Sequence, residues 1–443
     1  MKKILLSLIT ILMPLALLAQ QAGDNFTIKT TDGKTTEWSL AGDSKNGDIS
    51  TIKHKSNQLI LYAKGYEGIE WATYDIDKIE SITFNVFHKG SYVEESAAQA
   101  VKNMGIGTNF GNCTDVVAMW MNMNSNSVTD FEKAWGQEPT TKPMVDFLKQ
   151  NGFNSVRIPV TWFQHMKADG TVDEAWMNRI QEIVDYVIDN GMYCILNVHH
   201  DTGADSDDVK HWIKADEANY KENKEKFESL WTQIATRFKN YDQHLLFEGY
   251  NEMLDADNTW NAPKSASSYN GLNGYAQSFV NAVRATGGNN ETRNLIINTY
   301  AAANGDDVLN NLVIPTDKVD GHIAVEVHTY APWDWFAQKG KWDASCSNEI
   351  KNMFTRLNNK FISKGIPCII GEYGTHGSKS VSKNSSASEI QAAADQAADI
   401  VKQAKAYGVA TFYWMSIFTE KDRTVPQWTL PTVVEAMKKA YNE

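Results

Sequence analysis

The sequence has few cysteines, and their spacing does not indicate a disulfide framework. Only four occur in 443 residues, and none of them has a CxxC neighbour. A chain of this length can bury a core without disulfides, and cysteine-based metal sites usually show paired, closely spaced ligands. Cys194 and Cys368 lie inside apolar runs, where a free thiol behaves as a small hydrophobic side chain. We therefore expect no disulfide scaffold and no cysteine-based metal site.

Clusters of basic residues are also missing. The net charge is −12 at pH 7, and no run of Lys or Arg stands out. Nucleic acids and anionic membrane surfaces repel an acidic chain, so neither is expected as a partner. A neutral polymer such as a glycan is not excluded by charge. The chain has 14 Trp residues, a high number for its length; they could lie in the core, or several could be platforms on which sugar rings stack.

After residue 19 no apolar stretch is long enough to span a bilayer. Met1–Ala19 itself is typical of a signal peptide, with Lys2–Lys3 as the positive segment, an apolar run after it, and Ala19 at the expected cleavage position. Pro14 and the shortness of the run argue against a membrane-spanning helix. We therefore expect an exported protein, secreted, periplasmic or at the cell surface, with no membrane insertion. A monomer is expected.

Residues 20–90 are predicted to form a small all-β module. An Asp32–Gly33 turn signal stands between two runs of alternating polar and apolar residues, which is the pattern of a β-hairpin. Short strand patterns continue to about residue 88. The role of the module stays open: it could be a structural spacer, or it could bind glycan through three aromatic residues, Trp38, Tyr66 and Trp71.

From residue 91 to 443, apolar strand patterns alternate with amphipathic helix patterns. The segments Asp173–Asn190 and Lys221–Phe238, for example, repeat apolar residues at helical spacing and are flanked by apolar runs. Helices that alternate with strands predict a parallel sheet, and eight such units fit a closed (β/α)8 TIM barrel of the α/β class. A doubly wound open sheet is the alternative, but no glycine-rich phosphate loop follows the first strand.

Two of the apolar runs deliver a glutamate: HLLFEGYNEMLD leads to Glu252, and IPCIIGEYG leads to Glu372. Either acid alone could be an ordinary strand-end residue. In a TIM barrel, however, the chemistry lies at the carboxyl ends of the strands. Two carboxyl groups at one such end are the minimum for cleaving a glycosidic bond with retention. Asn251 stands beside Glu252. The other predicted strands also end in polar or aromatic side chains, namely Asn109, Arg157, Trp162, His199, His200, His328, Tyr330 and Trp414.

A metal site is an alternative use of part of this set. His199, His200 and Asp201 are consecutive, and Glu326 and His328 alternate with valines on a later strand. These residues do not form the ligand pattern of a known zinc site. We therefore predict neither a metal nor another cofactor.

With these residues assembled, the chain resembles glycoside hydrolase family 5 and, within it, the subfamily 4 endoglucanases and xyloglucanases. The similar segments keep the family's order from about residue 93 to the end: GTNFGN, SVRIPVTW, ILNVHHD, EGYNEM, VEVHTYAPWDW, IIGEYG, FYWM and DRTVPQWTLPTVVEAM. The resemblance implies a retaining mechanism with Glu252 as acid/base and Glu372 as nucleophile. It also implies that six residues shape the subsite around the cleaved bond: Arg157, His199, Asn251, His328, Tyr330 and Trp414.

The expected chemistry predicts how the site is charged. Glu372 must be ionised to attack, while Glu252 must hold a proton at neutral pH, so we expect burial and the neighbouring carboxylate to raise the pKa of Glu252. Retention requires the two carboxyl groups to lie about 5–5.5 Å apart. Arg157 would keep Glu372 charged, and Tyr330 would donate a hydrogen bond to it. Asn251 would bind the sugar 2-hydroxyl, or else it caps its strand.

The remaining rim residues are assigned to substrate contact. His199 and His328 would bind hydroxyl groups or orient the acids, and Asn109 and His200 complete the substrate-binding set. Trp414 is expected to be a platform for a sugar ring, with a place in the core as the alternative. Three more tryptophans are either platforms for sugar rings or ordinary loop packing residues: Trp162, Trp333 and Trp335.

The prediction for the whole chain is a retaining endo-β-1,4-glucanase, or cellulase. Its partner would be a β-glucan polysaccharide: a cellulose-like chain, mixed-linkage glucan or xyloglucan. A β-mannanase on the same barrel and a surface glycan-binding protein that has lost activity are the alternatives. The sequence leaves open which glycan is preferred and whether cleavage is endo or exo.

Overall fold

The computed structural model describes residues 25–39, 49–63, 70–85, 92–332, 341–375, 380–414 and 423–443. Contacts within the chain divide it into two compact units, Met1–Ser91 and Tyr92–Glu443. The predicted signal peptide, Met1–Ala19, lies outside the described residues. Within the described ranges, no helix has the length and apolar character needed to cross a bilayer.

The first unit contains two antiparallel three-stranded sheets. One has the order β2-β1-β6 and the other the order β3-β4-β5. In the turn between β1 and β2, Gly33 has a φ of 85°, a left-handed conformation that glycine adopts without strain. The predicted hairpin and the all-β character of the module are therefore confirmed. The elements are β1 (Asn25–Thr30), β2 (Thr35–Ser39), β3 (Ile49–Lys55), β4 (Gln58–Ala63), β5 (Glu70–Asp75), the short 3-10 helix η1 (Ile76–Lys78) and β6 (Ile79–Asn85).

Trp38 belongs to the core of this module. Its side chain is buried in one cluster with Phe26 and Ile28, and its Nε1 donates to Tyr74 Oη at 2.9 Å. The interpretation of Trp38 as a glycan platform is therefore wrong. Trp71 on β5 is about half exposed, and Tyr66 lies outside the described residues.

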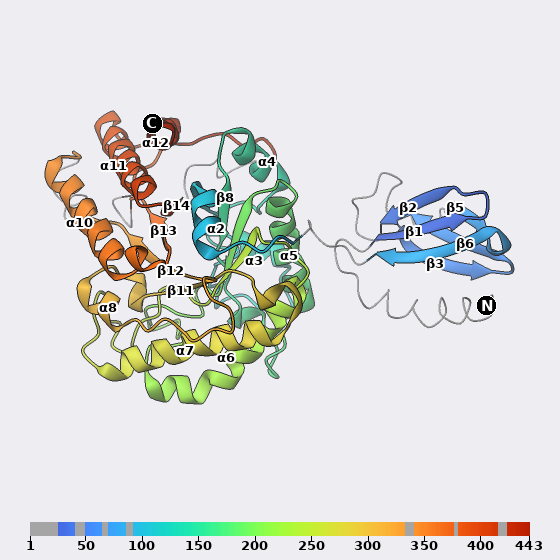
Figure 1. The fold of residues 1–443 in the computed structure, drawn as a ribbon, viewed down its shortest axis with the longest axis horizontal. Coiled ribbons are helices and arrows are strands. Elements are labelled where there is room, and N and C mark those ends of the chain that lie inside the picture. The colour runs from blue at the N-terminus through green and yellow to red at the C-terminus, as the bar shows by residue number, and fades with distance from the viewer. Residues whose placement is uncertain are drawn as a thin grey trace. The chain divides into compact units, whose positions relative to one another are not determined.

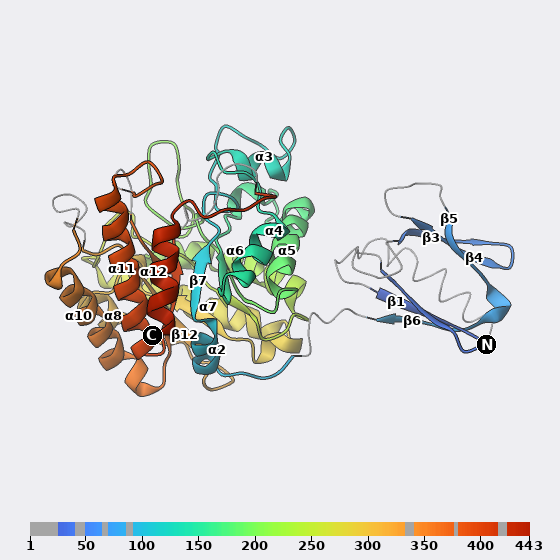
Figure 2. The same ribbon diagram turned by 90° about the horizontal axis from the view of Figure 1, so that it is seen from above.

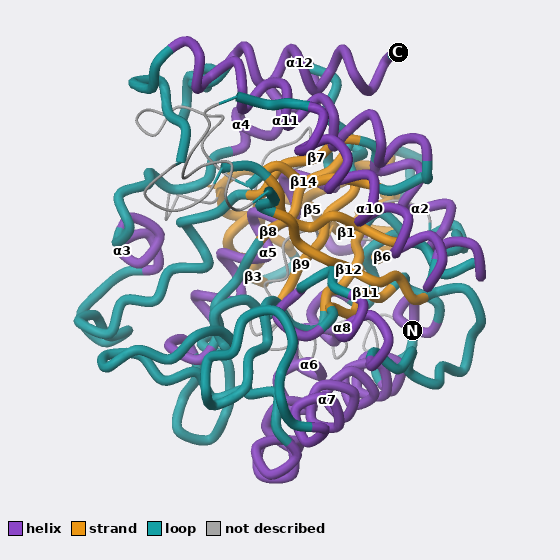
Figure 3. Tube along the Cα trace, turned by 90° about the vertical axis from the view of Figure 1, so that its left-hand side faces the viewer, coloured by secondary structure: helices purple, strands orange, loops and turns teal. Residues whose placement is uncertain are grey.

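The second unit is a closed barrel of eight parallel strands, which confirms the predicted fold class. Strand β14 pairs with β7 and closes the cylinder. Figure 3 shows the barrel strands in orange, with helices α4, α11 and α12 along one side and α6 and α7 along the opposite side. In chain order the strands are β7 (Ile106–Asn109), β8 (Ser155–Ile158), β9 (Tyr193–Asn197), β10 (Leu245–Glu248), β11 (Leu295–Asn298), β12 (Ile323–Thr329), β13 (Cys368–Tyr373) and β14 (Ala410–Tyr413).

In the described part of the chain, eight helices form a ring around these strands (Figure 1). They are α4 (Lys142–Gln150), α5 (Glu174–Ile188), α6 (Glu217–Phe238), α7 (Ala266–Ala285), α8 (Asp306–Asn311), α10 (Ala344–Lys360), α11 (Ala387–Ala406) and α12 (Pro431–Asn442). Helix α2 (Ala97–Met104) lies at one end of strand β7, and α3 (Val128–Lys133) lies beyond the other (Figure 2). Four short 3-10 helices complete the unit: η2 (Phe163–His165), η3 (Gly288–Glu291), η4 (Tyr300–Ala302) and η5 (Ile362–Lys364).

Helix α5 shows how the local sequence sets these elements. Asp173 is its N-cap, and its side chain accepts from Ala175 N at 3.0 Å and from Trp176 N at 3.3 Å, which satisfies two amide groups of the first turn. Ile180 and Val187 lie on the apolar face and are completely buried against the barrel. The predicted segment Asp173–Asn190 therefore exceeds the helix by its two cap residues, Asp173 and Asp189, and by Asn190 in the turn that follows.

The strands separate two apolar cores. Side chains that point inward, such as Ile195, Leu246 and Ile369, form one cluster with Ala97 and Val101 of α2. The alternate side chains pack outward against the surrounding helices. Helix α2 covers the amino-terminal end of the barrel with apolar side chains. The carboxyl-terminal end is where a barrel of this kind places its chemistry. All four cysteines are buried with free thiols.

Candidate active site

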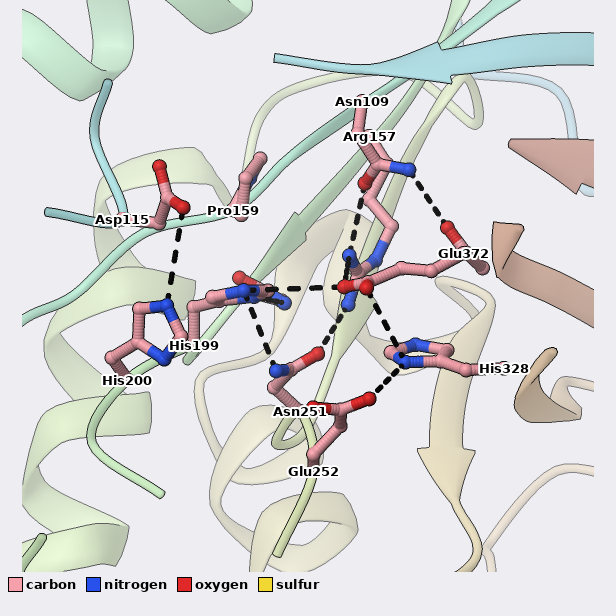
Figure 4. A network of polar contacts seen from close by, with 12 residues as sticks. Asn109, Asp115, Arg157, Pro159, His199, His200, Asn251, Glu252, His328 and Glu372 are labelled. Atoms are coloured by element: carbon pink, nitrogen blue, oxygen red, sulfur yellow. Dashed lines mark hydrogen bonds and ion pairs between the residues drawn. The ribbon is translucent and has the colours of Figure 1, made fainter. Parts of the chain in front are cut away.

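Glu252 and Glu372 face each other at the carboxyl end of the barrel. Glu252 follows β10, and Glu372 lies on β13. His328 on β12 lies between them, with Nδ1 2.8 Å from Glu252 Oε1 and 3.6 Å from Glu372 Oε2 (Figure 4). One oxygen of each carboxyl group and a nitrogen of His328 all lie within 4.8 Å of one another. Two acids far apart in the chain are thus brought into one site.

A β-bulge directs Glu372 into this site. On β12 and β13, Val327 pairs with Ile370 but His328 pairs with Glu372, so Gly371 is an extra residue on β13. An extra residue turns the side chain that follows it toward the other face of the strand. Without this bulge, Glu372 would point toward the outer helices, because alternate residues of a strand face opposite sides.

Arg157 on β8 connects Glu372 to a buried network. Its Nη1 donates to Glu372 Oε1 at 2.9 Å and to Asn109 Oδ1 at 2.9 Å, and its Nη2 donates to Asn251 Oδ1 at 2.8 Å. Two further bonds, from Nε at 2.7 Å and from Nη2 at 2.8 Å, form a bidentate pair with Glu248. Burial alone would lower the pKa of Arg157, but its carboxylate neighbours raise it well above its usual value. Arg157 is therefore a permanent cation at the base of the site.

Both oxygens of Glu372 are held by protein donors. Arg157 binds Oε1, and Tyr330 Oη donates to Oε2 at 2.6 Å. Burial, followed by the nearby carboxylates, raises the pKa of Tyr330, so its phenol stays protonated and donates. The predicted hydrogen bond from Tyr330 to Glu372 is therefore confirmed.

The charge on the two acids differs from the prediction. Burial raises the pKa of Glu372 to about 7, with a further rise from Glu252 and opposing effects from His328 and Arg157. For Glu252, burial acts in the same direction, but the hydrogen bond and positive charge of His328 outweigh it and lower the pKa. The expected raised pKa of Glu252 is therefore wrong for the free site, because the prediction left out the imidazolium next to this carboxyl group.

His328 holds the proton of this cluster. Burial would lower its pKa, but Glu372, Glu252 and Glu326 favour the imidazolium and raise the pKa to about 10. Its two ring nitrogens face two carboxylates, since Nε2 lies 3.2 Å from Glu326 Oε1. In the free site His328 is thus a cation that can donate toward Glu252.

His199 and Trp414 form the opposite wall. Asn197 Nδ2 lies 3.0 Å from His199 Nδ1, which leaves Nε2 of the ring facing Glu372 Oε1 at 3.9 Å and Asn251 Nδ2 at 3.4 Å. Burial, followed by His200 and Arg157, lowers the pKa of His199 well below its usual value, so this ring is neutral. The Trp414 ring stacks parallel to it and is only partly buried.

Two predicted substrate contacts are corrected. Trp162 is fully buried, and its Nε1 donates to Asn197 O at 2.9 Å, so it packs in the core and cannot be a sugar platform. Asn109 is also buried, with Oδ1 on Arg157 and Nδ2 donating to Gly371 O at 2.8 Å. Asn109 and Arg157 therefore fix the position of Glu372 from below and do not face the substrate. The predicted platforms Trp333 and Trp335 lie outside the described residues.

His200 stands slightly apart from the two acids. Its Nε2 lies 4.0 Å from Asp115 Oδ2, a buried oxygen without a hydrogen-bond partner in the described chain (Figure 4). Its ring faces Trp135 at 5.6 Å between ring centroids. Trp135 is 37% exposed, whereas Asp115 is completely buried. Neither residue was predicted, because nothing in the sequence around them marks a strand end.

The metal alternative is not assembled as the sequence suggested. Asp201 points away from the histidines and accepts from Trp162 N at 2.7 Å and from Trp212 Nε1 at 2.6 Å. Two other groups in the described chain have ligand atoms within 4.8 Å of one another: Asp115 with His199 and His200, and Glu252 with His328 and Glu372. In the second group the imidazole lies between two carboxyl groups within hydrogen-bonding or ion-pair distance, which is the arrangement of an acid–base site.

Three buried polar residues were missed as parts of the network: Asn197, Glu248 and Asn298. Asn197 and Asn298 each donate from Nδ2 to Glu248 Oε1, both at 3.2 Å, beneath Arg157. Each is the last residue of its strand and follows an apolar run. A polar residue inside a strand, rather than after it, is the sequence feature that indicates such a buried network.

Comparisons with known proteins agree with this geometry. A family model described as Cellulase (glycosyl hydrolase family 5) matches residues 113–418. Cellulase/esterase CelE of Acetivibrio thermocellus is 35% identical over 77% of this chain, but the match spans only 40% of that protein's length. Endoglucanase B of Clostridium cellulovorans is 34% identical over 77% of this chain and 75% of its own length.

A solved structure is more similar still. PbGH5A, a glycoside hydrolase family 5 enzyme from Prevotella bryantii B14, is 58% identical and superimposes with a TM-score of 0.76, over 80% of this chain and 100% of that one. A mutant of that enzyme has been solved in complex with the xyloglucan tetradecasaccharide XXXGXXXG.

Proposed function

This chain belongs to glycosyl hydrolase family 5, and from that premise we propose that it is an exported, retaining endo-β-1,4-glucanase that acts on xyloglucan and related β-glucans. The observation that carries the retaining mechanism is the approach of Glu252 and Glu372 within 4.8 Å. Inverting enzymes leave about 6.5–9.5 Å between their carboxyl groups for a water molecule, whereas retaining enzymes leave about 5–5.5 Å.

In the first step Glu372 attacks the anomeric carbon. Arg157 and Tyr330 each hold one of its oxygens, which fixes the direction of attack. Glu252 protonates the leaving glycosidic oxygen. The proton comes from His328, whose Nδ1 lies 2.8 Å from Glu252 Oε1; when it crosses that hydrogen bond, His328 becomes neutral and Glu252 becomes the acid.

In the second step water releases the sugar from Glu372. Esterified Glu372 carries no charge, so Glu252 accepts the proton of the attacking water as a general base. The cycle balances, because the proton given to the leaving alcohol is recovered from water. Asn251, held through Oδ1 by Arg157, is placed to contact the sugar 2-hydroxyl with its amide group.

The substrate proposal rests on the relatives. A mutant of the 58% identical enzyme has been solved with a xyloglucan tetradecasaccharide, and curated relatives are endoglucanases. The partly buried Trp414 and the exposed Trp135 at the mouth suit the faces of sugar rings. The alternatives, a β-mannanase and an inactive glycan-binding protein, gain no support from these observations.

Export is proposed from the sequence alone. Met1–Ala19 has the charge and apolar pattern of a signal peptide, and a polysaccharide too large to enter a cell requires an exported hydrolase. N-terminal sequencing of the secreted protein tests this directly: a mature chain that begins near residue 20 is expected, and a chain that retains Met1 in the cytoplasm would contradict it.

The activity is tested on xyloglucan, carboxymethyl-cellulose, mixed-linkage glucan and mannan. We expect reducing ends to appear on the glucans, with a rapid fall in viscosity that marks internal cleavage. Proton NMR of the first product should show the β-anomer before mutarotation, as retention requires. Glu252→Gln and Glu372→Ala should each lower kcat by orders of magnitude, and near wild-type hydrolysis by either variant would end the assignment.

A further inference from the structure

Glu326 on β12 is a buried carboxylate that the proposed mechanism does not use. Its side chain is completely inaccessible, so no substrate atom reaches it. Its Oε1 lies 3.2 Å from His328 Nε2 and 3.3 Å from Arg157 Nε, while Oε2 has no hydrogen-bond partner in the described chain. Anything that Glu326 contributes to the reaction must therefore pass through one of these neighbours.

The contact with His328 is the one that leads to the reacting groups. The ring of His328 is held from both sides, with Nε2 on Glu326 and Nδ1 on Glu252. A carboxylate on one ring nitrogen fixes the orientation of the ring and keeps the opposite N–H directed at its partner. Without Glu326, the ring would lose the contact that defines its plane.

Strand β13 leaves space for this carboxylate. A Cβ atom built on Gly371 would lie 1.8 Å from Glu326 Oε1 and 2.2 Å from its Cδ, closer than any real contact. Gly371 is also the extra residue of the bulge that aims Glu372. Its φ is not positive, so a side chain at position 371 is opposed by space and not by backbone conformation. The glycine before Glu372 and the glutamate near His328 therefore depend on each other.

We propose that Glu326 is a positioning residue for hydrolysis: it holds Nε2 of His328 so that Nδ1–H points at Glu252, and Gly371 provides the space for it. The inference rests on the proposed glucanase function and adds to it a residue that acts from beneath the site. Other charged groups also face this pair: Arg157 from β8, Glu248 from β10, Glu252 beyond β10 and Glu372 from β13. None of these groups is substituted in the variants below.

The first test compares Glu326→Gln with Glu326→Leu. Gln keeps the shape and an acceptor oxygen but removes the negative charge that stabilises the imidazolium, so His328 should lose its proton at lower pH. We expect kcat within about tenfold of wild type and an alkaline limb of kcat/KM that moves to lower pH by about one unit. Leu removes the acceptor as well, and kcat should fall at least a hundredfold with KM changed less than threefold.

Asp317→Asn is the matched control. Asp317 also pairs with a buried arginine, Arg284, at 2.7 Å, but it lies before the amino-terminal end of β12, away from the acids. This variant should lower the melting temperature without moving the pH profile. If Glu326→Leu behaved in the same way, with kcat and both pH limbs unchanged, Glu326 would be a structural residue and the inference would be overturned.

A double-mutant cycle supplies the second test. Gly371→Ala should lower kcat at least tenfold because the new methyl group displaces the Glu326 carboxylate. In a Glu326→Ala background that space is empty, so adding Gly371→Ala should change kcat less than twofold. Equal losses in both backgrounds would show that the glycine serves some other purpose and would contradict the inference.

These outcomes are distinct from a failure of the proposed function. If the wild-type enzyme did not cleave any glucan, the glucanase assignment would fail before the variants were measured. If the wild type cleaved xyloglucan and Glu326 variants matched it in rate and pH profile, only the positioning role would fail.

Discussion

His199 lies flat against Trp414, with ring centroids 5.7 Å apart and planes within 6° of parallel. His199 follows β9 and Trp414 follows β14, two strands that β7 and β8 separate in the barrel, and the two rings together form one wall beside Glu372. His199 is buried and neutral, while Trp414 keeps part of its surface accessible. The stack therefore presents an indole face, backed by an imidazole, to the space where the sugar would lie.

Trp414→Ala should weaken both substrate binding and the position of His199. A partly exposed indole contributes dispersion and apolar contact to a sugar ring, and a stacked aromatic pair contributes about 0.5–1.5 kcal/mol beyond area burial. We expect kcat/KM on xyloglucan to fall at least tenfold, with a smaller fall for Trp414→Phe. The control is Trp162→Phe in the core, which should lower the melting temperature but leave KM within twofold. Equal KM effects at the two positions would show that Trp414 is not a platform.

The pH profile of kcat/KM should be bell-shaped and displaced to high pH. Glu372 must be ionised to attack, and burial raises its pKa to about 7, with Glu252 adding repulsion. The pair of His328 and Glu252 must hold a proton, and the pKa of His328 is about 10 because carboxylates overcome the effect of burial. Rates measured across this range should give an acid limb near 7 and an alkaline limb toward 10. An acid limb near the ordinary glutamate value of 4.5 would show that Glu372 is not raised.

Glu372→Gln should gain stability relative to the wild type as the pH rises to neutral. The folded pKa of Glu372 is raised above its unfolded value of 4.5, so the folded state binds more protons and the stability of the wild type falls as pH rises from 4.5 through about 7. Glutamine carries no charge and escapes this loss. The difference in melting temperature between variant and wild type should therefore grow from pH 5 to pH 8. A constant difference over that interval would contradict the prediction.

Arg157→Lys should fail although it keeps the charge. Nε and Nη2 of the guanidinium bind Glu248, Nη1 binds Glu372 and Asn109, and Nη2 also reaches Asn251. An ammonium group cannot match that fork. Breaking a buried pair costs about 3–5 kcal/mol. We expect a loss of about this size in the free energy of unfolding, measured in urea, and a fall in kcat of at least a hundredfold. Arg179→Lys, which disturbs a pair with Glu132 on the outer helices, should leave kcat unchanged.

The barrel could be predicted from sequence because its signals are local. Helix α5 follows from the Asp173 cap and from apolar residues such as Ile180 at helical spacing, and each strand follows from a short apolar run. The chain order of these elements then admits a closed parallel barrel. Glu252 and Glu372 could be placed at one mouth from that argument alone, without any knowledge of their distance.

The rest of the site depends on contacts that no local pattern contains. Trp162 follows a strand just as Trp414 does, but the backbone turns it into the core, where it bonds Asn197 O. The lowered pKa of Glu252 comes from His328, which is brought 2.8 Å away only by the closure of the barrel. The bulge at Gly371 likewise cannot be predicted from the alternation of inward and outward side chains, because a bulge interrupts that alternation.

The barrel should fold and work without the first module. Among the described residues, the buried cluster of the module contains only residues from Phe26 to Ile79, and every cluster of the barrel unit begins at Ala97 or later. Two separate cores mean two folding units, each with its own unfolding transition. A chain that starts at Tyr92 should therefore keep the melting temperature of the barrel and its kcat on soluble xyloglucan within twofold. Calorimetry of the longer chain should show a second, smaller transition that the truncated chain lacks. Loss of folding on truncation would mean that the barrel depends on the module for its stability.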